Sequence, residues 1–167
     1  MKHCSLHTLP VLLAMTIAAV AAATSSCSDG SCADLQSAMP LARLVTSGTT
    51  TAVTPAALTA RGIGAVGADS LLADNATQSD LYLPLRAADT LCAFELTLNT
   101  ATTDTITVFY RARPYFADAE CGAMYVFALD SVRATTHGID SVERVVRETT
   151  NSAQVALRIH IPADTTL

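Results

Sequence analysis

The chain has 167 residues, and its 10 basic side chains against 15 acidic ones give a formal net charge of −5. Lys2 is the only lysine and the arginines form no run, which argues against nucleic acid as a partner because phosphate binding needs clustered cations. The length suits a single domain with a hydrophobic core of its own.

The N-terminal segment has the features of an export signal. Its apolar run, Leu9–Ala23, is shorter than the ~20 residues that a membrane-spanning helix needs. The run is followed by Thr24-Ser25-Ser26-Cys27, where small residues before a cysteine resemble the processing site of a bacterial lipoprotein. We expect residues 1–26 to be removed as a lipoprotein signal peptide, Cys27 to carry the lipid, and residues 27–38 to form a tether.

A second cleavage site competes with this interpretation. The small residues Ala21-Ala22-Ala23 are typical of the site that an ordinary secretory peptidase recognises. Cleavage there would release the protein instead of anchoring it. Lipidation is favoured because it explains the position of Cys27 at the boundary, and because several acyl chains anchor a protein stably where one does not.

Short runs of alternating apolar and polar residues follow the tether. An alternation with a period of two predicts strands that turn one face towards a core. The clear runs are Leu41–Thr46, Gly62–Gly67, Leu81–Arg86, Cys92–Leu98, Ile106–Arg111, Met124–Val132 and Val155–Ile161. Ile139–Arg147 fits a strand or a helix, and its valines favour the strand. The sequence therefore predicts an all-β domain over residues 39–167, an antiparallel, immunoglobulin-like β-sandwich of seven or eight strands.

A dipeptide of Asp and Ser or Thr, followed by an apolar residue, recurs along the domain. Asp side chains bond the backbone of turns, so the simplest interpretation is a turn before each new strand. Alternatively, the motif resembles the O-glycosylation acceptor of secreted proteins of the Bacteroidetes type. The hydroxyl groups concerned would then be those of Ser70, Thr90, Thr105, Ser131 and Ser141.

Several short motifs occur together in a fixed order. They are the lipobox cysteine, Cys32, Pro40-Leu41, Arg61–Gly64, Asp69–Leu71, Leu81–Leu85, Thr105–Val108 with Tyr110, Cys121-Gly122 and Ile159–Ile161. In this order they resemble a family of small uncharacterised lipoproteins of Bacteroidetes bacteria. The resemblance implies an envelope location and a β fold, and it brings no assigned activity.

The cysteines after Cys27 are Cys32, Cys92 and Cys121. Cys92 alternates with buried-type residues, so we expect it to point into the core as a small apolar side chain. The resemblance implies that Cys32 and Cys121 match the two cysteines of the family. Since export favours disulfides, we expect these two to pair, which would add about 4 kcal/mol of stability in the chain-entropy model. The alternative is that all three thiols stay reduced.

Motifs that carry catalysis or bind a metal are not visible in the sequence. Zinc sites need three or four clustered ligands, whereas only His137 and His160 remain after export, the first in a turn and the second on a solvated strand face. A glycosidase needs two carboxylates across a cleft, whereas Asp118 and Glu120 are separated by one residue in a loop, where acidic side chains are more often simply solvated. We therefore expect no enzyme activity, no cofactor and no metal.

The segment that best suits a partner surface combines aromatic and arginine side chains, which are favoured at binding hot spots. It consists of Tyr110, Arg111, Arg113, Tyr115 and Phe116. We expect a non-enzymatic component of the cell envelope, anchored by lipid, with the outer membrane as the favoured site, and facing the periplasm or the surface. Its partner would be an unknown protein or glycan. A carbohydrate-binding accessory lipoprotein is the alternative, and an enzyme with dispersed catalytic residues is a third class.

Overall fold

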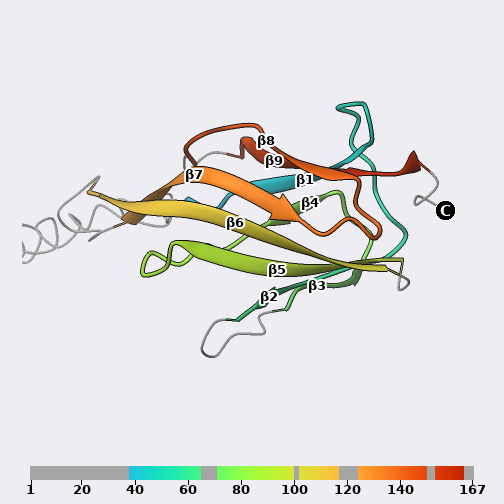
Figure 1. Ribbon diagram of the computed structural model, residues 1–167, viewed down its shortest axis with the longest axis horizontal. Helices are drawn as coiled ribbons and strands as arrows, with labels where there is room; N and C mark the ends of the chain where they lie inside the picture. Colours follow the sequence, from blue (N-terminus) through green and yellow to red (C-terminus); the bar gives the residue numbers. More distant parts are fainter. Residues whose placement is uncertain (1–37, 65–70, 100–101, 117–123, 150–152, 164–167) are drawn as a thin grey trace, which may run out of the picture. The chain divides into compact units, whose positions relative to one another are not determined.

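The computed structural model describes residues 38–64, 71–99, 102–116, 124–149 and 153–163 (Figure 1). All of them belong to one compact unit, which spans Cys32–Leu167. The expected signal peptide, the lipidated Cys27 and the Cys32–Cys121 pair lie outside the described residues, as do Ser70 and the loop with Asp118 and Glu120.

The described residues form nine strands in two sheets with almost no helix, which confirms the all-β, two-layer fold (Figure 1). The strands are β1 (Leu41–Thr46), β2 (Leu58–Ile63), β3 (Leu71–Ala76), β4 (Asp80–Tyr82), β5 (Leu91–Leu98), β6 (Thr102–Tyr115), β7 (Met124–Ala134), β8 (Ser141–Arg144) and β9 (Val155–Ile161). One sheet has the order β4-β1-β9-β8 and the other β3-β2-β5-β6-β7. Sequence patterning missed β3, whose residues do not alternate, and most of β2, since the predicted run Gly62–Gly67 shares only Gly62 and Ile63 with it. The predicted run Leu81–Arg86 is a strand only as far as Tyr82.

One strand pair departs from the expected antiparallel arrangement, because β1 and β9 run parallel in the middle of the four-stranded sheet. Antiparallel neighbours follow from short hairpins, whereas parallel neighbours need a long connection between them. The two strands come from opposite ends of the domain, so the whole intervening chain serves as that connection. The other strand pairs are antiparallel.

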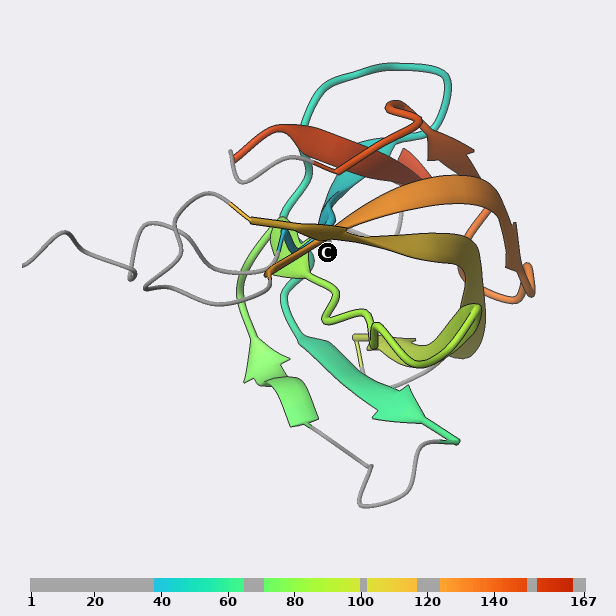
Figure 2. The same ribbon diagram turned by 90° about the vertical axis from the view of Figure 1, so that its left-hand side faces the viewer.

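Alternation along the strands places the core between the two sheets. In β6, Ile106, Val108 and Tyr110 are buried, and in β9 the same holds for Ile159 and Ile161. Figure 2, seen from the left-hand end of Figure 1, shows how the strands of the two sheets curve around the interior of the domain. Burial of such apolar side chains is the main favourable contribution to folding.

The uncertain segment Ile139–Arg147 contains a short strand and no helix. Only Ser141–Arg144 forms β8, which pairs with β9 at the edge of the four-stranded sheet. The chain then continues along β7 of the other sheet, where the Leu129 amide donates to the Arg147 carbonyl at 2.8 Å and the Thr149 amide donates to Phe127 at 2.9 Å. The segment after β8 therefore links the edges of the two sheets.

A buried carboxylate fixes the connection between β7 and β8. The Asp104 side chain on β6 accepts the Thr135 hydroxyl at 2.6 Å and the backbone amides of His137, Gly138 and Ile139 at 2.8, 2.7 and 2.9 Å. Burial alone would raise the pKa of Asp104, but these four hydrogen bonds together outweigh it and hold the pKa below its ordinary value. Asp104 is 2 % exposed, so its charge is stabilised almost entirely by this loop.

Candidate functional site

The expected partner surface lies at the end of β6, with one exception. Arg111, Arg113 and Tyr115 alternate along the outer face, and their side chains are exposed together with that of Phe116. Tyr110 points the other way and is 1 % exposed, so its assignment to this surface was wrong. The reason is the period of two, which places Tyr110 on the face of Ile106 and Val108.

Tyr110 instead fastens the connection between β4 and β5 to the core. Its hydroxyl donates to the Arg86 carbonyl at 2.8 Å and accepts the Arg86 amide at 3.0 Å, and it lies 3.1 Å from the Cys92 sulfur. Its ring packs edge-to-face on Phe127, with centroids 5.4 Å apart. Burial and the contact with Cys92 raise the pKa of Tyr110, so the phenol stays protonated.

Cys92 packs against the core as expected. Its thiol is free and forms no disulfide with another described residue.

A β-bulge interrupts β7 next to this surface. Phe109 is paired with Ser131, and Tyr110 with Leu129, so Asp130 is an additional residue without a partner on β6. Asp130 and Ser131 are therefore both exposed. Alternation predicted the strand but missed the bulge. The bulge could have been recognised from the spacing of the apolar residues. It is two residues from Phe127 to Leu129 but three from Leu129 to Val132.

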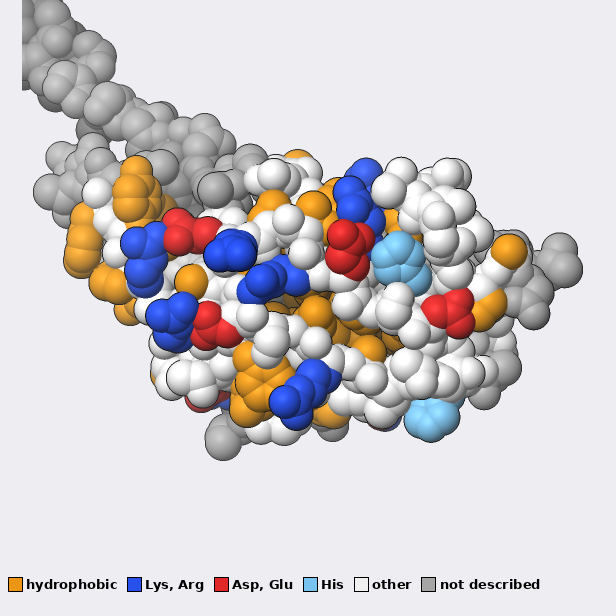
Figure 3. Space-filling model, turned by 45° about the horizontal axis from the view of Figure 1, so that its top comes forward, with side chains coloured by type: hydrophobic (Ala, Val, Ile, Leu, Met, Phe, Trp, Pro, Cys, Tyr) orange, Lys and Arg blue, Asp and Glu red, His pale blue; other side chains and the backbone are white. Residues whose placement is uncertain are grey.

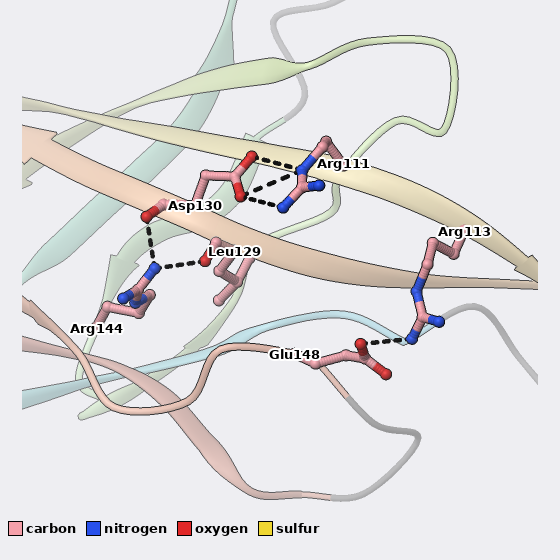
Figure 4. A network of polar contacts seen from close by, with 6 residues as sticks. All are labelled: Arg111, Arg113, Leu129, Asp130, Arg144 and Glu148. Carbon is pink, nitrogen blue, oxygen red and sulfur yellow. Dashed lines mark hydrogen bonds and ion pairs between the residues drawn. The ribbon is translucent and has the colours of Figure 1, made fainter.

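The bulge organises a network of arginines, which Figure 4 shows. Arg111 donates to both carboxylate oxygens of Asp130, at 2.7 and 3.0 Å, and this pairing lowers the pKa of Asp130. From β8, the Nη1 atom of Arg144 donates to the Leu129 carbonyl at 2.6 Å and also to the Asp130 carbonyl. Arg144 thus bridges the two sheets at the bulge, through the carbonyls of two consecutive residues of β7.

Further arginines surround this network. Arg113 pairs with Glu148, and the Arg133 guanidinium lies 5.4 Å from the centre of the Phe109 ring. Arg147 is exposed and meets β7 through its carbonyl. In the part of the chain that the structure describes, the side chains of Arg133, Arg144 and Arg147 form no ion pair with a carboxylate.

We call the following residues the arginine surface: Arg111, Arg113, Arg133, Arg144 and Arg147. The carboxylates paired with it are Asp130 and Glu148. Figure 3 shows basic side chains gathered on this face, with fewer acidic ones between them. Because the whole chain is acidic, this local excess of positive charge sets the face apart from the rest of the molecule.

The expected glycosylation sites occupy different settings. Thr90 is exposed just before β5, and Ser141 is exposed as the first residue of β8, so both lie where the turn interpretation places them, at the start of a strand. It fails at the other two described positions, because Thr105 is half-buried within β6 and Ser131 follows the bulge within β7.

The two histidines do not meet in a common site. His137 is exposed, and its Nδ1 atom lies 3.1 Å from the Asp104 carboxylate. His160 was expected to be solvated, but its side chain is only 16 % exposed because β9 lies between two other strands and Glu143 is 3.6 Å away. Over the described ranges, no group of three or more His, Cys, Asp or Glu residues could hold a metal ion.

Among the same residues there is no helix of the length and apolar character needed to cross a membrane.

Comparisons with known proteins gave a match to a family whose function is unknown. Neither the curated proteins nor the solved structures gave a match to this chain. A family model matches residues 58–161, from the first residue of β2 to the last residue of β9. This match covers more than half of the sequence and includes the bulge, the arginine surface and Asp104. The chain therefore belongs to the family of unknown function DUF6452.

Proposed function

We propose that the protein is an exported, lipid-anchored component of the cell envelope that binds a partner without chemical turnover. The leader before Cys27 and the resemblance to Bacteroidetes lipoproteins support the location, with the outer membrane as the favoured site. The arginines of the arginine surface that form no ion pair among the described residues, Arg133, Arg144 and Arg147, support a binding role. The partner, a protein or a glycan, would carry carboxylate or phosphate groups.

One observation carries this proposal, namely the fixed orientation of Arg144. Two backbone carbonyls hold its Nη1 atom, while Nε and Nη2 have no partner in the described part of the chain (Figure 4). These two nitrogens form the planar fork that recognises a carboxylate or phosphate with two parallel hydrogen bonds. A guanidinium that is already held loses less entropy on binding than a mobile one. Arg147 adds a second charge beside it.

Calorimetric titration tests the arginine surface directly. The full chain in detergent is titrated with polyglutamate, as a probe for acidic proteins, and with polygalacturonate, as a probe for acidic glycans. We expect one of them to bind and Arg147→Gln to weaken it about tenfold, the cost of one hydrogen bond between charged groups. Arg61→Gln is the matched control, because Arg61 is an exposed arginine on β2 that pairs with Glu95. An equal loss in the control, or no binding of either polymer, would contradict the proposal.

The location is tested separately by fractionation. Cys27→Ala should move the protein from the membrane fraction to the soluble fraction, because the lipid would no longer be attached. Mass spectrometry of the native protein should show acyl chains on Cys27. A protein that stays in the membrane after this change would contradict lipid anchoring.

Carbohydrate binding is the second candidate, favoured by the exposed aromatic pair at the end of β6. Tyr115 and Phe116 are 51 % and 68 % exposed, and flat aromatic rings next to Arg113 suit stacking on a sugar. A glycan array distinguishes the two functions. Binding of a neutral glycan that Phe116→Ala abolishes and Arg147→Gln leaves unchanged would favour this candidate.

A further inference from the structure

Exposed apolar side chains gather at the end of the domain where the described chain begins. The Ala38 amide donates to the Tyr125 carbonyl at 2.9 Å, on the side of β7 that faces away from β6. On the other side, Met124 is the register partner of Tyr115. Residue 39 and the end of β6 therefore lie on either side of one strand, about 10 Å apart at the usual strand spacing. Figure 1 shows the start of β1 and the end of β6 towards the same end of the sandwich.

We call Met39, Tyr115 and Phe116 the aromatic end. Their exposed fractions are 42, 51 and 68 %, which places them among the large apolar side chains that the fold leaves in solvent. Figure 3 shows an orange group of this kind beside the basic side chains. Apolar patches rimmed by charge mark surfaces that meet a partner or a membrane.

The length of chain before Ala38 points to the occupant of this surface. If Cys27 carries the lipid, eleven peptide steps join it to Ala38, a reach of at most about 40 Å. β6 has 14 residues and spans about 45 Å, so its beginning lies much farther from the anchor than its end. The aromatic end is therefore the part of the described domain that the anchor holds nearest to the bilayer.

The chemistry of the aromatic end fits a bilayer surface. Aromatic and methionine side chains enter the boundary between headgroups and acyl chains, and arginines attract anionic headgroups. Arg113 alternates with Tyr115 on the outer face of β6, and Arg111 precedes it on the same face. Both arginines are paired with carboxylates, Arg111 with Asp130 and Arg113 with Glu148, so we expect the apolar side chains to contribute most of the affinity for the bilayer.

We propose that the aromatic end docks on the membrane to which the protein is anchored, with Tyr115 and Phe116 inserted between the lipid headgroups. This proposal rests on the lipid anchoring of Cys27 and goes beyond it. The domain then lies against the bilayer in one orientation instead of moving freely around its tether. The arginine surface, which begins beside the aromatic end, is held close to the headgroups.

Tryptophan fluorescence tests the docking, because the chain contains no tryptophan of its own. The full lipidated chain carrying Phe116→Trp is reconstituted into vesicles of phosphatidylcholine and phosphatidylglycerol, with and without brominated acyl chains. We expect its emission to shift to shorter wavelength and to be quenched by the bromine atoms. Tyr115→Trp is the second variant, and circular dichroism checks that both fold.

The matched control is Thr50→Trp, in an exposed loop after the far end of β1. Its emission should remain that of a solvated indole, without quenching. The proposal is overturned if the variants at 115 and 116 behave like this control while the protein is in the vesicles. Failure of the anchor itself is a different result, since the lipidated chain would then not be recovered from the native membrane at all.

Discussion

Replacing Asp104 by Asn tests whether one carboxylate holds the β7–β8 connection in place. The side chain is buried and receives four hydrogen bonds from Thr135, His137, Gly138 and Ile139. Asn has nearly the same shape, so the change removes the charge and one acceptor atom and creates no cavity. The result therefore reports on the charge and its hydrogen bonds, without a change in packing.

The expected loss of stability follows from the geometry. Oδ1 accepts Thr135 and His137, while Oδ2 accepts Gly138 and Ile139. Whichever oxygen becomes the amide nitrogen, at least one backbone amide of the loop then faces another donor, and the remaining hydrogen bonds lose the charge that strengthens them. Each hydrogen bond to a charged group contributes about 1.5–3 kcal/mol, so we expect Asp104→Asn to lower the free energy of unfolding by about 3–5 kcal/mol.

The effect should depend on pH in a defined direction. The hydrogen bonds hold the pKa of Asp104 below the value of about 3.9 that the unfolded chain would have. A carboxyl group with a lowered pKa stabilises the fold above the unfolded pKa, and this contribution is lost as the pH falls through the folded pKa. Asn does not titrate. The difference in the free energy of unfolding between the unchanged protein and Asp104→Asn should therefore become smaller as the pH falls below about 4.

Chemical denaturation at neutral pH and at about pH 3 measures both quantities. Asp74→Asn is the matched control, because Asp74 is exposed on β3 and its replacement should change stability by less than about 0.5 kcal/mol. The reasoning is refuted if Asp104→Asn costs no more than this control. It is also refuted if the loss in the free energy of unfolding that Asp104→Asn causes is the same at both pH values.

Two further substitutions and a peptide map test other parts of the structure. Tyr110→Phe should cost about 1–2 kcal/mol in thermal unfolding, because both backbone groups of Arg86 lose a partner, whereas Tyr82→Phe, at an exposed side chain of β4, should cost nothing measurable. Gly138→Ala should destabilise the fold by a similar ~1–2 kcal/mol, because the added Cβ would lie 3.0 Å from the branched side chain at position 102. A peptide map under non-reducing conditions should show the expected disulfide between Cys32 and Cys121. Finding both as free thiols would contradict that pairing.

The strands β1, β9 and β3 show which parts of the fold could be predicted from the sequence. The alternation in Leu41–Thr46 and Val155–Ile161 predicted β1 and β9 within the bounds that the structure has. The same pattern could not reveal that these two strands pair in parallel, because pairing joins residues more than a hundred positions apart. Leu71–Ala76 lacks alternation and becomes a strand through its pairing with β2.

The candidate site was predictable in part. Arg111 and Arg113 were expected on the surface, and they are exposed there. Tyr110 was placed with them because it is their neighbour in sequence, although its strand position turns it inward. Arg144 carried no local signal at all, since its role depends on the carbonyls that the bulge at Asp130 presents.

The sequence by itself determined the class of the fold, the buried faces of its strands and an N-terminal segment typical of export, because these depend on residue type and on a period of two. The tertiary structure decided the order of the strands, the bulge, the arginine network and the burial of Asp104. Each of these depends on hydrogen bonds between distant segments, and their register is set only when the two sheets pack together.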